Sequence, residues 1–436
     1  MFGMSTNWHK RNLGELVKVQ GGFAFKKPDF EDAGLPIVRM SDLKVGRLDL
    51  DSAVRISEYK LRLSSKFKLD AGDFLVGMSG SIGNYAIVRE SDLPAYLNQR
   101  VGRFQLINEK LTDYNFITQI ARSYEYKLHI DTLAAGAAQV NISPSQIESF
   151  QFGLPPKSEQ TKIAEILSTL DLAIEQTEAI IAKQQRIKTG LMQDLLTKGI
   201  DENGNIRSEA THEFKDSALG RIPVEWDVAQ LHEFAAAIDP QPDHRTPPQM
   251  DNGVPYIGIS DFNENDSIDF DSARKISFTA YRKQRKAFTV ELGDFIFGKI
   301  GTIGTPKRLP TDFDYALSAN IILLKPKDKS TFVFWWMVSA IVENLVALEI
   351  HSTSQPAFGI QKMRSLSIPR LTNIEQHQIG KVFDKFAETM SSESTRLVKL
   401  RKLKAGLMQD LLTGKVRVSD IQNPISTPES SCPPMN

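Results

Sequence analysis

Apolar residues recur at steps of about three and four in two long stretches of the chain, residues 157–197 and 371–414. The segment Gly-Leu-Met-Gln-Asp-Leu-Leu-Thr begins at Gly190 in the first stretch and at Gly406 in the second, an offset of 216 (406 − 190). This spacing predicts two long helices that pack against one another. At about 1.5 Å per residue, a helix from Lys157 to Thr197 would be roughly 60 Å long.

At that offset, apolar residues of one stretch match apolar residues of the other, and we predict that they form the interface between the two helices. In the first helix these are Ile163, Leu167, Leu170, Ile174, Ile181 and Leu191, and in the second Ile379, Phe383, Phe386, Met390, Leu397 and Leu407. Ile187 and Leu403 continue the same pattern. Two equal helices, each following a globular segment, would act as a spacer that holds two modules a fixed distance apart.

The globular segments, residues 8–156 and 226–370, have a mixed pattern and repeat one another. Residues 35–39 and 73–76 are typical of short strands, and residues 111–130 predict a helix that begins near Asp113. Gly72-Asp-Phe recurs at Gly293, and the offset drifts from 218 (226 − 8) to 221 (293 − 72). Loops of changed length on a shared core explain this drift. Modules that diverged on one scaffold would bind two different targets.

The chain divides into six predicted segments. Pro155 and Pro156 end the first module, and Gly414 ends the second helix. The spacing of Gly, Asn and Asp after Thr197 is typical of loops. We predict a first module at 1–156, a helix at 157–197, a linker at 198–225, a second module at 226–370, a helix at 371–414 and a flexible tail at 415–436.

The composition limits the class of protein. A chain of 436 residues suits two or more domains, and its hydrophobic content of 41% and charged content of 24% are ordinary for a globular protein. No apolar run approaches the ~18–20 residues that cross a bilayer, and the first residues do not form a signal peptide. The single cysteine, Cys432, excludes disulfides, so we expect a cytoplasmic protein. Basic and acidic residues number 53 each, so the net charge indicates no partner.

Basic residues, interleaved with aromatic ones, form runs at the same place in both modules, residues 55–68 and 274–286. Such a run is usually a solvated surface, but paired basic patches also suit phosphate contacts on duplex DNA. Gln99 and Arg100 are further candidates, for reading base edges, and a surface role fits them equally well. The candidates in the two runs are Lys60, Arg62 and Lys66, and then Tyr281, Arg282, Lys283, Arg285 and Lys286.

Each module also contains a Gly-rich loop, residues 77–83 and 298–304. Neither fits the phosphate-binding loop of nucleotide hydrolases or the dinucleotide-binding fingerprint. A tight turn between strands is the simpler interpretation. The alternative is close approach to a phosphate, with Ser79, Ser81, Lys299 or Thr302 as donors.

Catalytic signals are weak. The 7 histidines form no His-Glu-x-x-His motif and no Cys/His cluster, and no Gly-x-Ser-x-Gly or adenine-methylase signature occurs. We therefore predict no catalytic residue and no metal site. Asp29, Glu58 and Lys60 resemble the set of a metal-dependent nuclease, although the second module has no equivalent. A stand-alone nuclease of this kind and a coiled-coil scaffold without a DNA role remain alternatives.

An ordered set of motifs occurs twice and covers nearly the whole chain. Its first copy comprises Leu154-Pro-Pro, Glu159-Gln160 with Ile163-Ala164, and Gly190-Leu-Met-Gln-Asp-Leu-Leu-Thr. Its second copy comprises Ile368-Pro369, Glu375-Gln376 with Ile379, and Gly406-Leu-Met-Gln-Asp-Leu-Leu-Thr. With these motifs, and with Gly72-Asp-Phe-Leu-Val and Gly80-Ser-Ile-Gly, the chain resembles the specificity (S) subunit of a type I restriction–modification system. Met78 departs from the pattern, since the family often has a basic residue there.

The resemblance implies an α+β fold in which two mixed target-recognition domains are joined by two long antiparallel helices with pseudo-twofold symmetry. Each domain would read one half of a split DNA target, and the helices would fix the unread gap and dock two methyltransferase subunits. Restriction (nuclease/translocase) subunits would complete this host-defence complex. S-adenosylmethionine, ATP and Mg would bind the partner subunits, one of which would flip and methylate an adenine. This chain would be non-catalytic and without its own cofactor.

Overall fold

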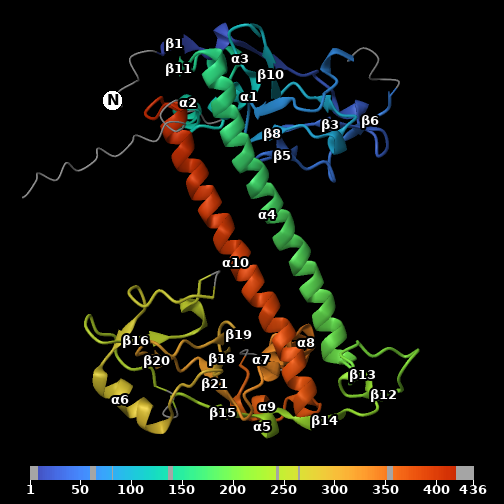
Figure 1. Ribbon diagram of the computed structural model, residues 1–436, viewed down its shortest axis with the longest axis vertical. Coiled ribbons are helices and arrows are strands. Elements are labelled where there is room, and N and C mark those ends of the chain that lie inside the picture. Colours follow the sequence, from blue (N-terminus) through green and yellow to red (C-terminus); the bar gives the residue numbers. More distant parts are fainter. Residues whose placement is uncertain are drawn as a thin grey trace, which may run out of the picture. The chain divides into compact units, whose positions relative to one another are not determined.

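The computed structural model describes residues 8–58, 65–80, 82–135, 141–241, 245–263, 266–350 and 357–418 (Figure 1). The chain forms two compact units. Unit 1 consists of Met1–Gln176 with Leu397–Asn436, and unit 2 consists of Thr177–Arg396. Each unit contains one globular module and a part of each long helix.

The largest sheet of unit 1 is antiparallel and has the strand order β2-β10-β7-β8. These strands are β2 (Val17–Gly21), β10 (Val101–Leu106), β7 (Phe74–Gly77) and β8 (Tyr85–Ile87). A second sheet comprises β6 (Arg55–Ile56), β3 (Leu35–Val38) and β9 (Tyr96–Leu97). In addition, β1 (His9–Asn12) pairs with β11 (Gln151–Leu154), and β4 (Leu43–Lys44) pairs with β5 (Arg47–Leu48). The strands predicted at 35–39 and 73–76 are confirmed as β3 and β7.

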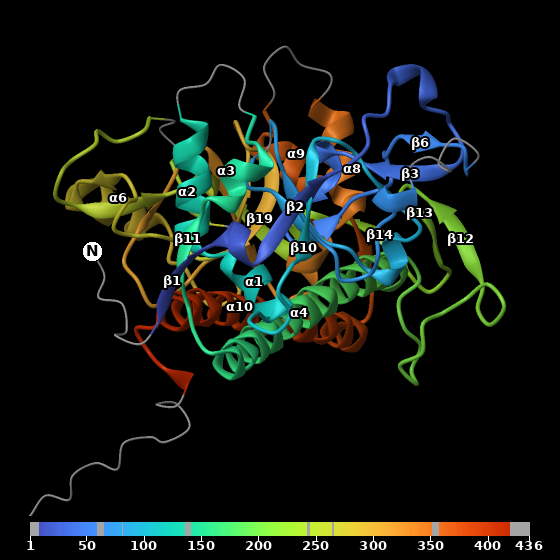
Figure 2. The ribbon, with the colours of Figure 1, turned by 90° about the horizontal axis from the view of Figure 1, so that it is seen from above.

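The helices of the unit 1 module are α1 (Tyr114–Ile120), α2 (Tyr124–Ala134) and α3 (Pro144–Glu148). α1 lies against the first half of the long helix α4 (Figures 1 and 2), and Gln119 donates to Asp171 across this contact. Asp113 caps α1 as predicted, because its side chain accepts from the Phe116 N–H. The prediction of a single helix over 111–130 is wrong, because the chain turns after α1 and Ser123 caps a separate helix, α2.

Unit 2 repeats this topology. Its four-stranded sheet has the order β15-β21-β18-β19, made of β15 (Ala235–Ile238), β21 (Ile321–Pro326), β18 (Phe295–Gly298) and β19 (Gly304–Arg308). The second sheet comprises β17 (Lys275–Ile276), β16 (Val254–Ile257) and β20 (Ala316–Leu317), and β14 (Asp227–Gln230) pairs with β22 (Ser367–Arg370). The helices are α5 (Leu231–Phe234), α6 (Phe278–Ala287), α7 (Phe332–Met337), α8 (Ala340–Ile350) and α9 (Ile360–Arg364).

The two long helices are α4 (Lys157–Thr197) and α10 (Asn373–Leu412), at the positions that the apolar pattern predicts. In unit 1 they run antiparallel, because Ile163 shares a core with Leu411 while Asp171, further along α4, meets Lys404. Together with the repeated topology, these helices confirm the predicted fold class. α10 ends two residues before Gly414, whose φ of 73° is left-handed, so the predicted stop is confirmed.

The predicted interface residues do not form one uniform stripe. Ile163, Leu167 and Leu407 pack into the core of unit 1, and Leu191, Ile379 and Phe383 into that of unit 2, where module residues also contribute. Leu170, Ile174, Ile181, Phe386, Met390 and Leu397 are half-buried. Ile187 and Leu403 are 41% and 52% exposed, so their assignment to this stripe is wrong. Each helix end is therefore buried mainly by a module core, and the middle is less covered.

Two predicted irregular segments are ordered. The linker at 198–225 contains a hairpin of β12 (Phe214–Ser217) and β13 (Gly220–Pro223), and Arg207 from it is paired with the buried carboxylate of Glu375. At the start of the predicted tail, Arg417 donates to both oxygens of Glu159 and Val418 is 3% exposed. These positions contradict a fully irregular linker and a fully flexible tail. Residues 419–436, with Cys432, lie outside the described residues.

Candidate nucleic-acid interface

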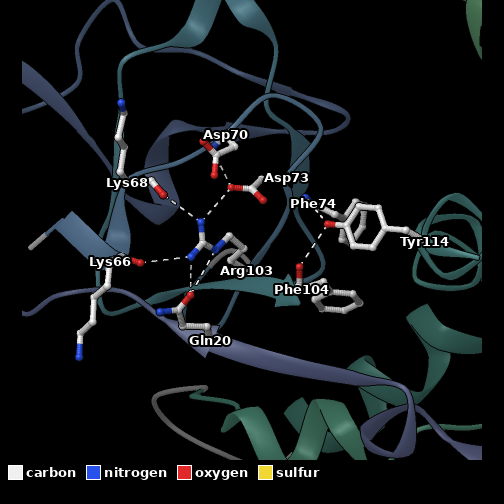
Figure 3. Close-up of polar contacts among 9 residues, drawn as sticks. All are labelled: Gln20, Lys66, Lys68, Asp70, Asp73, Phe74, Arg103, Phe104 and Tyr114. Atoms are coloured by element: carbon white, nitrogen blue, oxygen red, sulfur yellow. Dashed lines mark hydrogen bonds and ion pairs between the residues drawn. The ribbon is translucent and has the colours of Figure 1, made fainter. Parts of the chain in front are cut away.

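In unit 1, the buried guanidinium of Arg103 on β10 fixes the end of the first basic run (Figure 3). Its Nη1 donates to the Lys68 carbonyl at 2.9 Å and to Asp73 Oδ2 at 3.1 Å. Its Nη2 donates to Gln20 Oε1 at 2.6 Å and to the Lys66 carbonyl at 3.2 Å. A planar fork with several donors suits such a multipoint contact. The backbone of this segment is therefore held from inside the module.

This anchoring leaves the lysine side chains exposed. Figure 3 shows the side chains of Lys66 and Lys68 extending away from Arg103, and both residues are exposed. Between them Phe67 is buried, and the Lys66 ammonium lies 5.0 Å from the centroid of its ring. The arrangement presents two positive charges to solvent on a fixed stretch of backbone.

An exposed aromatic residue continues this surface. The ring of Phe23 lies 5.9 Å from that of Phe67, and Phe23 is 38% exposed. The Gln99 N–H donates to the Phe23 carbonyl at 3.0 Å, and both Gln99 and Arg100 are exposed. We call the set Phe23, Lys66, Lys68, Gln99 and Arg100 the unit 1 basic surface. It combines cations with an apolar face and an amide, the groups that contact phosphates and base edges in DNA.

Tyr114 from α1 bridges β7 and β10, the strands that carry Phe74 and Phe104 (Figure 3). Its hydroxyl donates to the Phe104 carbonyl at 3.2 Å and accepts from the Phe74 N–H at 2.9 Å. Burial raises the pKa of Tyr114 to about 12. The hydroxyl is protonated at neutral pH, as an ordinary tyrosine is, and its two hydrogen bonds bridge β7 and β10, which also pair directly as strands.

In unit 2, the second basic run forms the helix α6. Ser277 caps it, and the buried side chain of Gln284 exchanges two hydrogen bonds with the backbone of Leu317 and donates to the Pro240 carbonyl. Tyr281 donates to Asp314, and the Arg285 guanidinium lies 5.9 Å from the Tyr281 ring centroid. The exposed cations, which we call the unit 2 basic helix, are Arg282, Lys283, Arg285 and Lys286. The helix thus docks through Ala280, Tyr281 and Gln284, and its four cations belong to exposed residues on the rest of its surface.

The Gly-rich loops form turns beside the four-stranded sheets. Gly80 and Gly83 have φ of 65° and 88°, and Gly301 and Gly304 have φ of 76° and 88°. Glycine adopts this left-handed backbone without strain. In unit 1 the Met78 N–H donates to the Arg100 carbonyl, so the loop lies beside the unit 1 basic surface.

Two predicted phosphate donors in these loops point inward. Ser79 is 6% exposed and its hydroxyl donates to the sulfur of Met40, while Lys299 is 8% exposed and its ammonium is paired with Asp239 at 2.8 Å. Both side chains already have internal partners, so the structure contradicts their assignment as surface donors. Thr302 is exposed.

Three sequence candidates, Lys60, Arg62 and Ser81, lie outside the described residues. Sequence reasoning missed Phe23 and Arg103. A lone arginine inside an apolar strand pattern was the available signal for Arg103. Phe23 stands in a Gly-Gly-Phe-Ala-Phe segment that carries no distinctive pattern.

The described part of the chain offers no group of His, Cys, Asp and Glu side chains arranged for a metal ion. Of the nuclease-like set, Asp29 accepts from the Lys26 N–H in its own turn, and Lys60 is among the residues not described. Within the same described ranges, every helix is too short or too polar to span a membrane.

Comparison with known proteins identifies relatives along most of the chain. A model of the family "Type I restriction modification DNA specificity domain" matches residues 5–184 and again residues 223–402. The protein assigned as specificity subunit of the MjaX type I restriction enzyme of Methanocaldococcus jannaschii is 24% identical over 94% of this chain and 94% of its own length. The EcoBI specificity subunit of Escherichia coli is 22% identical over 87% of this chain and 79% of its own length.

A solved structure has a similar fold. The S subunit of a type I restriction–modification system from M. genitalium superposes with a TM-score of 0.63 at 15% identity. The match covers 94% of this chain and 98% of the other.

Proposed function

The chain belongs to the family of type I restriction–modification DNA specificity proteins, and we propose that it reads a split DNA target, with one half recognised by each unit. A specificity subunit is the recognition part of such a system and not its catalytic part. The observation that carries the proposal is that each unit has its own exposed basic surface, which buried side chains hold in place.

The two surfaces suit different contacts. Lys66 and Lys68 in unit 1 and the unit 2 basic helix would bind phosphates and fix the position of the protein on the duplex. Gln99 and Arg100 would read base edges in the first half of the target, because amide and guanidinium groups pair with adenine and guanine in the major groove. The two surfaces differ in residues and in secondary structure, which supports two unlike half-sites.

The long helices would set the length of the unread gap. Half-sites read from one face of DNA recur about every 10–10.5 base pairs, or ~34 Å, and a helix of roughly 60 Å is long enough to space them. The same helices would dock two methyltransferase subunits, and restriction subunits would complete the complex. S-adenosylmethionine, ATP and Mg would bind these partners, in the cytoplasm where the DNA lies.

Mapping of methylated adenine across the genome, with and without the gene, tests this function. One split adenine motif should disappear when the gene is deleted and return when it is restored. An unchanged set of motifs would refute the proposal.

Two measurements on the purified chain separate the alternatives. Cleavage of plasmid by the chain alone with magnesium would favour the nuclease. Absence of any electrophoretic shift of DNA at low salt would favour the scaffold.

A further inference from the structure

The central strands of the two large sheets, β10 and β21, can be compared residue by residue. Arg103 stands opposite Leu75 on one side and Gln20 on the other. Leu323 stands opposite Ile296 and Ile238 in the same way. Since Gly72-Asp-Phe matches Gly293-Asp-Phe, Leu75 matches Ile296, and Leu323 takes the place of Arg103. The buried cation of unit 1 is thus absent from the equivalent position of unit 2.

Unit 2 nevertheless contains the same anchor, made with a different residue. The Lys325 ammonium donates to Asp294 Oδ2 at 2.6 Å and to the Thr289 carbonyl at 2.9 Å. Asp294 matches Asp73 and Thr289 matches Lys68 at one offset, 221 (294 − 73 and 289 − 68). The cation has moved two residues along the strand, which keeps it on the same face because strand side chains alternate.

The groups around the cation also correspond. Phe67 and Phe288, again 221 apart (288 − 67), are each 8% exposed and immediately precede the anchored carbonyl. In unit 1 this carbonyl belongs to Lys68 of the unit 1 basic surface. In unit 2 it lies two residues after α6 ends, so the anchor holds the C-terminal end of the unit 2 basic helix. Both units therefore fix their basic segment at the same point by a cation from the sheet.

We propose that Arg103 and Lys325 are positioning residues for DNA recognition, which hold the basic segments in their binding geometry without contacting DNA. This inference rests on the proposed function. If the anchor is removed, the segment must be ordered when DNA binds, and that entropy cost weakens the complex. The same phosphates are still bound, so the salt dependence of binding stays the same.

The test measures the affinity of the full chain, in complex with its methyltransferase subunits, for DNA that carries the mapped target. The measurement is repeated over a range of salt concentrations. Arg103→Leu installs the residue that unit 2 has at this position. We expect the affinity for DNA to fall tenfold or more, while the slope of log K against log salt stays unchanged. Methylation of the target should also be reduced. As a contrast, Lys66→Gln with Lys68→Gln should lower the slope, by about 0.9 for each phosphate that is no longer neutralised.

A graft of the unit 2 arrangement supplies the control. Gln105 stands opposite Lys18 on β2. On its other side, the register that pairs Arg103 with Leu75 places Gln105 opposite Asp73 when it is continued by two residues. Lys325 is placed opposite Asp294 in the same way. The variant carrying Lys18→Ala, Gln20→Ile, Arg103→Leu and Gln105→Lys should regain most of the affinity.

Three results would overturn the proposal. The first is a slope of log K against log salt that falls by about one in Arg103→Leu, which would mean that Arg103 binds a phosphate itself. The second is a folded Arg103→Leu variant that binds DNA with wild-type affinity. The third is a folded graft variant that still binds DNA weakly. The denaturation midpoint establishes folding in each case. Failure of the proposed function gives a different result, because then the wild-type complex shows no preference for the target.

Discussion

The guanidinium of Arg122 donates to both carboxylate oxygens of Asp171, at 2.7 Å each. Arg122 lies between α1 and α2 in the unit 1 module, and Asp171 lies on α4. Gln119 donates to the same carboxylate at 3.0 Å, and Lys404 from α10 donates to it as well. One acidic side chain thus ties the module of unit 1 to both long helices.

Replacing Asp171 by Asn should destabilise unit 1 by about 2 kcal/mol, because it removes one partner of a charge-assisted bidentate pair and leaves the largely covered guanidinium of Arg122 without its counterion. Urea denaturation at pH 7 measures this. The matched control is Glu175→Gln, whose partner Arg89 is half exposed, and which should change stability by less than ~0.5 kcal/mol. Equal effects of the two changes would contradict the assigned role of Asp171.

The same pair predicts a pH dependence. Burial raises the pKa of Asp171, but the hydrogen bonds and charge of Arg122, with hydrogen bonds from Lys404 and Gln119, hold it below its ordinary value of 3.8. A carboxylate with a lowered pKa contributes its stability above the ordinary pKa and loses it as the pH falls through the folded value. The stability difference between the wild type and Asp171→Asn should therefore be constant from pH 5 to 7 and shrink below pH 4, about where the ordinary pKa lies. A stability difference between the two proteins that keeps its full size below pH 4 would contradict this.

In unit 2, Glu375 at the start of α10 is a buried ion-pair partner. It accepts from Arg207, from the Ile200 N–H at 2.9 Å and from the Trp226 indole N–H at 3.2 Å. Glu375→Gln should cost about 3 kcal/mol, because it leaves a buried guanidinium without its counterion. Glu159, its counterpart in unit 1, pairs with the more exposed Arg417, so Glu159→Gln should cost less. Thermal unfolding of both variants gives the comparison, and the reverse order would contradict the assignment.

The sequence predicted the long helices well because their apolar spacing repeats at a fixed offset of 216 (406 − 190). It could not predict the anchors, because Arg103 and Lys325 occupy non-equivalent positions and an alignment of the repeats does not pair them. It could not show that Ser79 and Lys299 face inward, since the direction of a side chain in a loop depends on packing. Secondary structure can be predicted from a local sequence pattern, whereas contacts between residues that are distant in the chain cannot.

Phe23 is predicted to contribute apolar contact with DNA. Phe23→Ala should weaken binding by about 1 kcal/mol, roughly fivefold, because less apolar surface is buried. Its salt slope should not change, since no charge is removed. Tyr124→Ala on α2, where Tyr124 is 74% exposed, is the control and should bind as the wild type does. Titrations at several salt concentrations distinguish these outcomes, and an unaffected Phe23→Ala variant would remove Phe23 from the interface.

The unit 2 basic helix is predicted to bind phosphates. Changing Arg282, Lys283, Arg285 and Lys286 to Gln should weaken binding and reduce the slope of log K against log salt by about 2 to 4, since each neutralised phosphate contributes ~0.9. The matched control changes four exposed lysines of unit 2 outside α6 to Gln, namely Lys327, Lys329, Lys381 and Lys385. If both quadruple variants lower the slope equally, the effect is one of net charge and α6 is not the interface.

The long helices are predicted to set the gap in the target. One helical turn inserted into the middle of α4 or α10 lengthens that helix by about 5.4 Å, while the rise of DNA is about 3.4 Å per base pair. The tolerated gap should therefore change by a base pair or so, and both half-sites should stay the same because the modules are untouched. Methylation mapping in cells that carry the insertion measures both properties, and an in-place replacement of the same turn without insertion is the control. Altered half-sites with an unchanged gap would show that these helices do not act as the spacer.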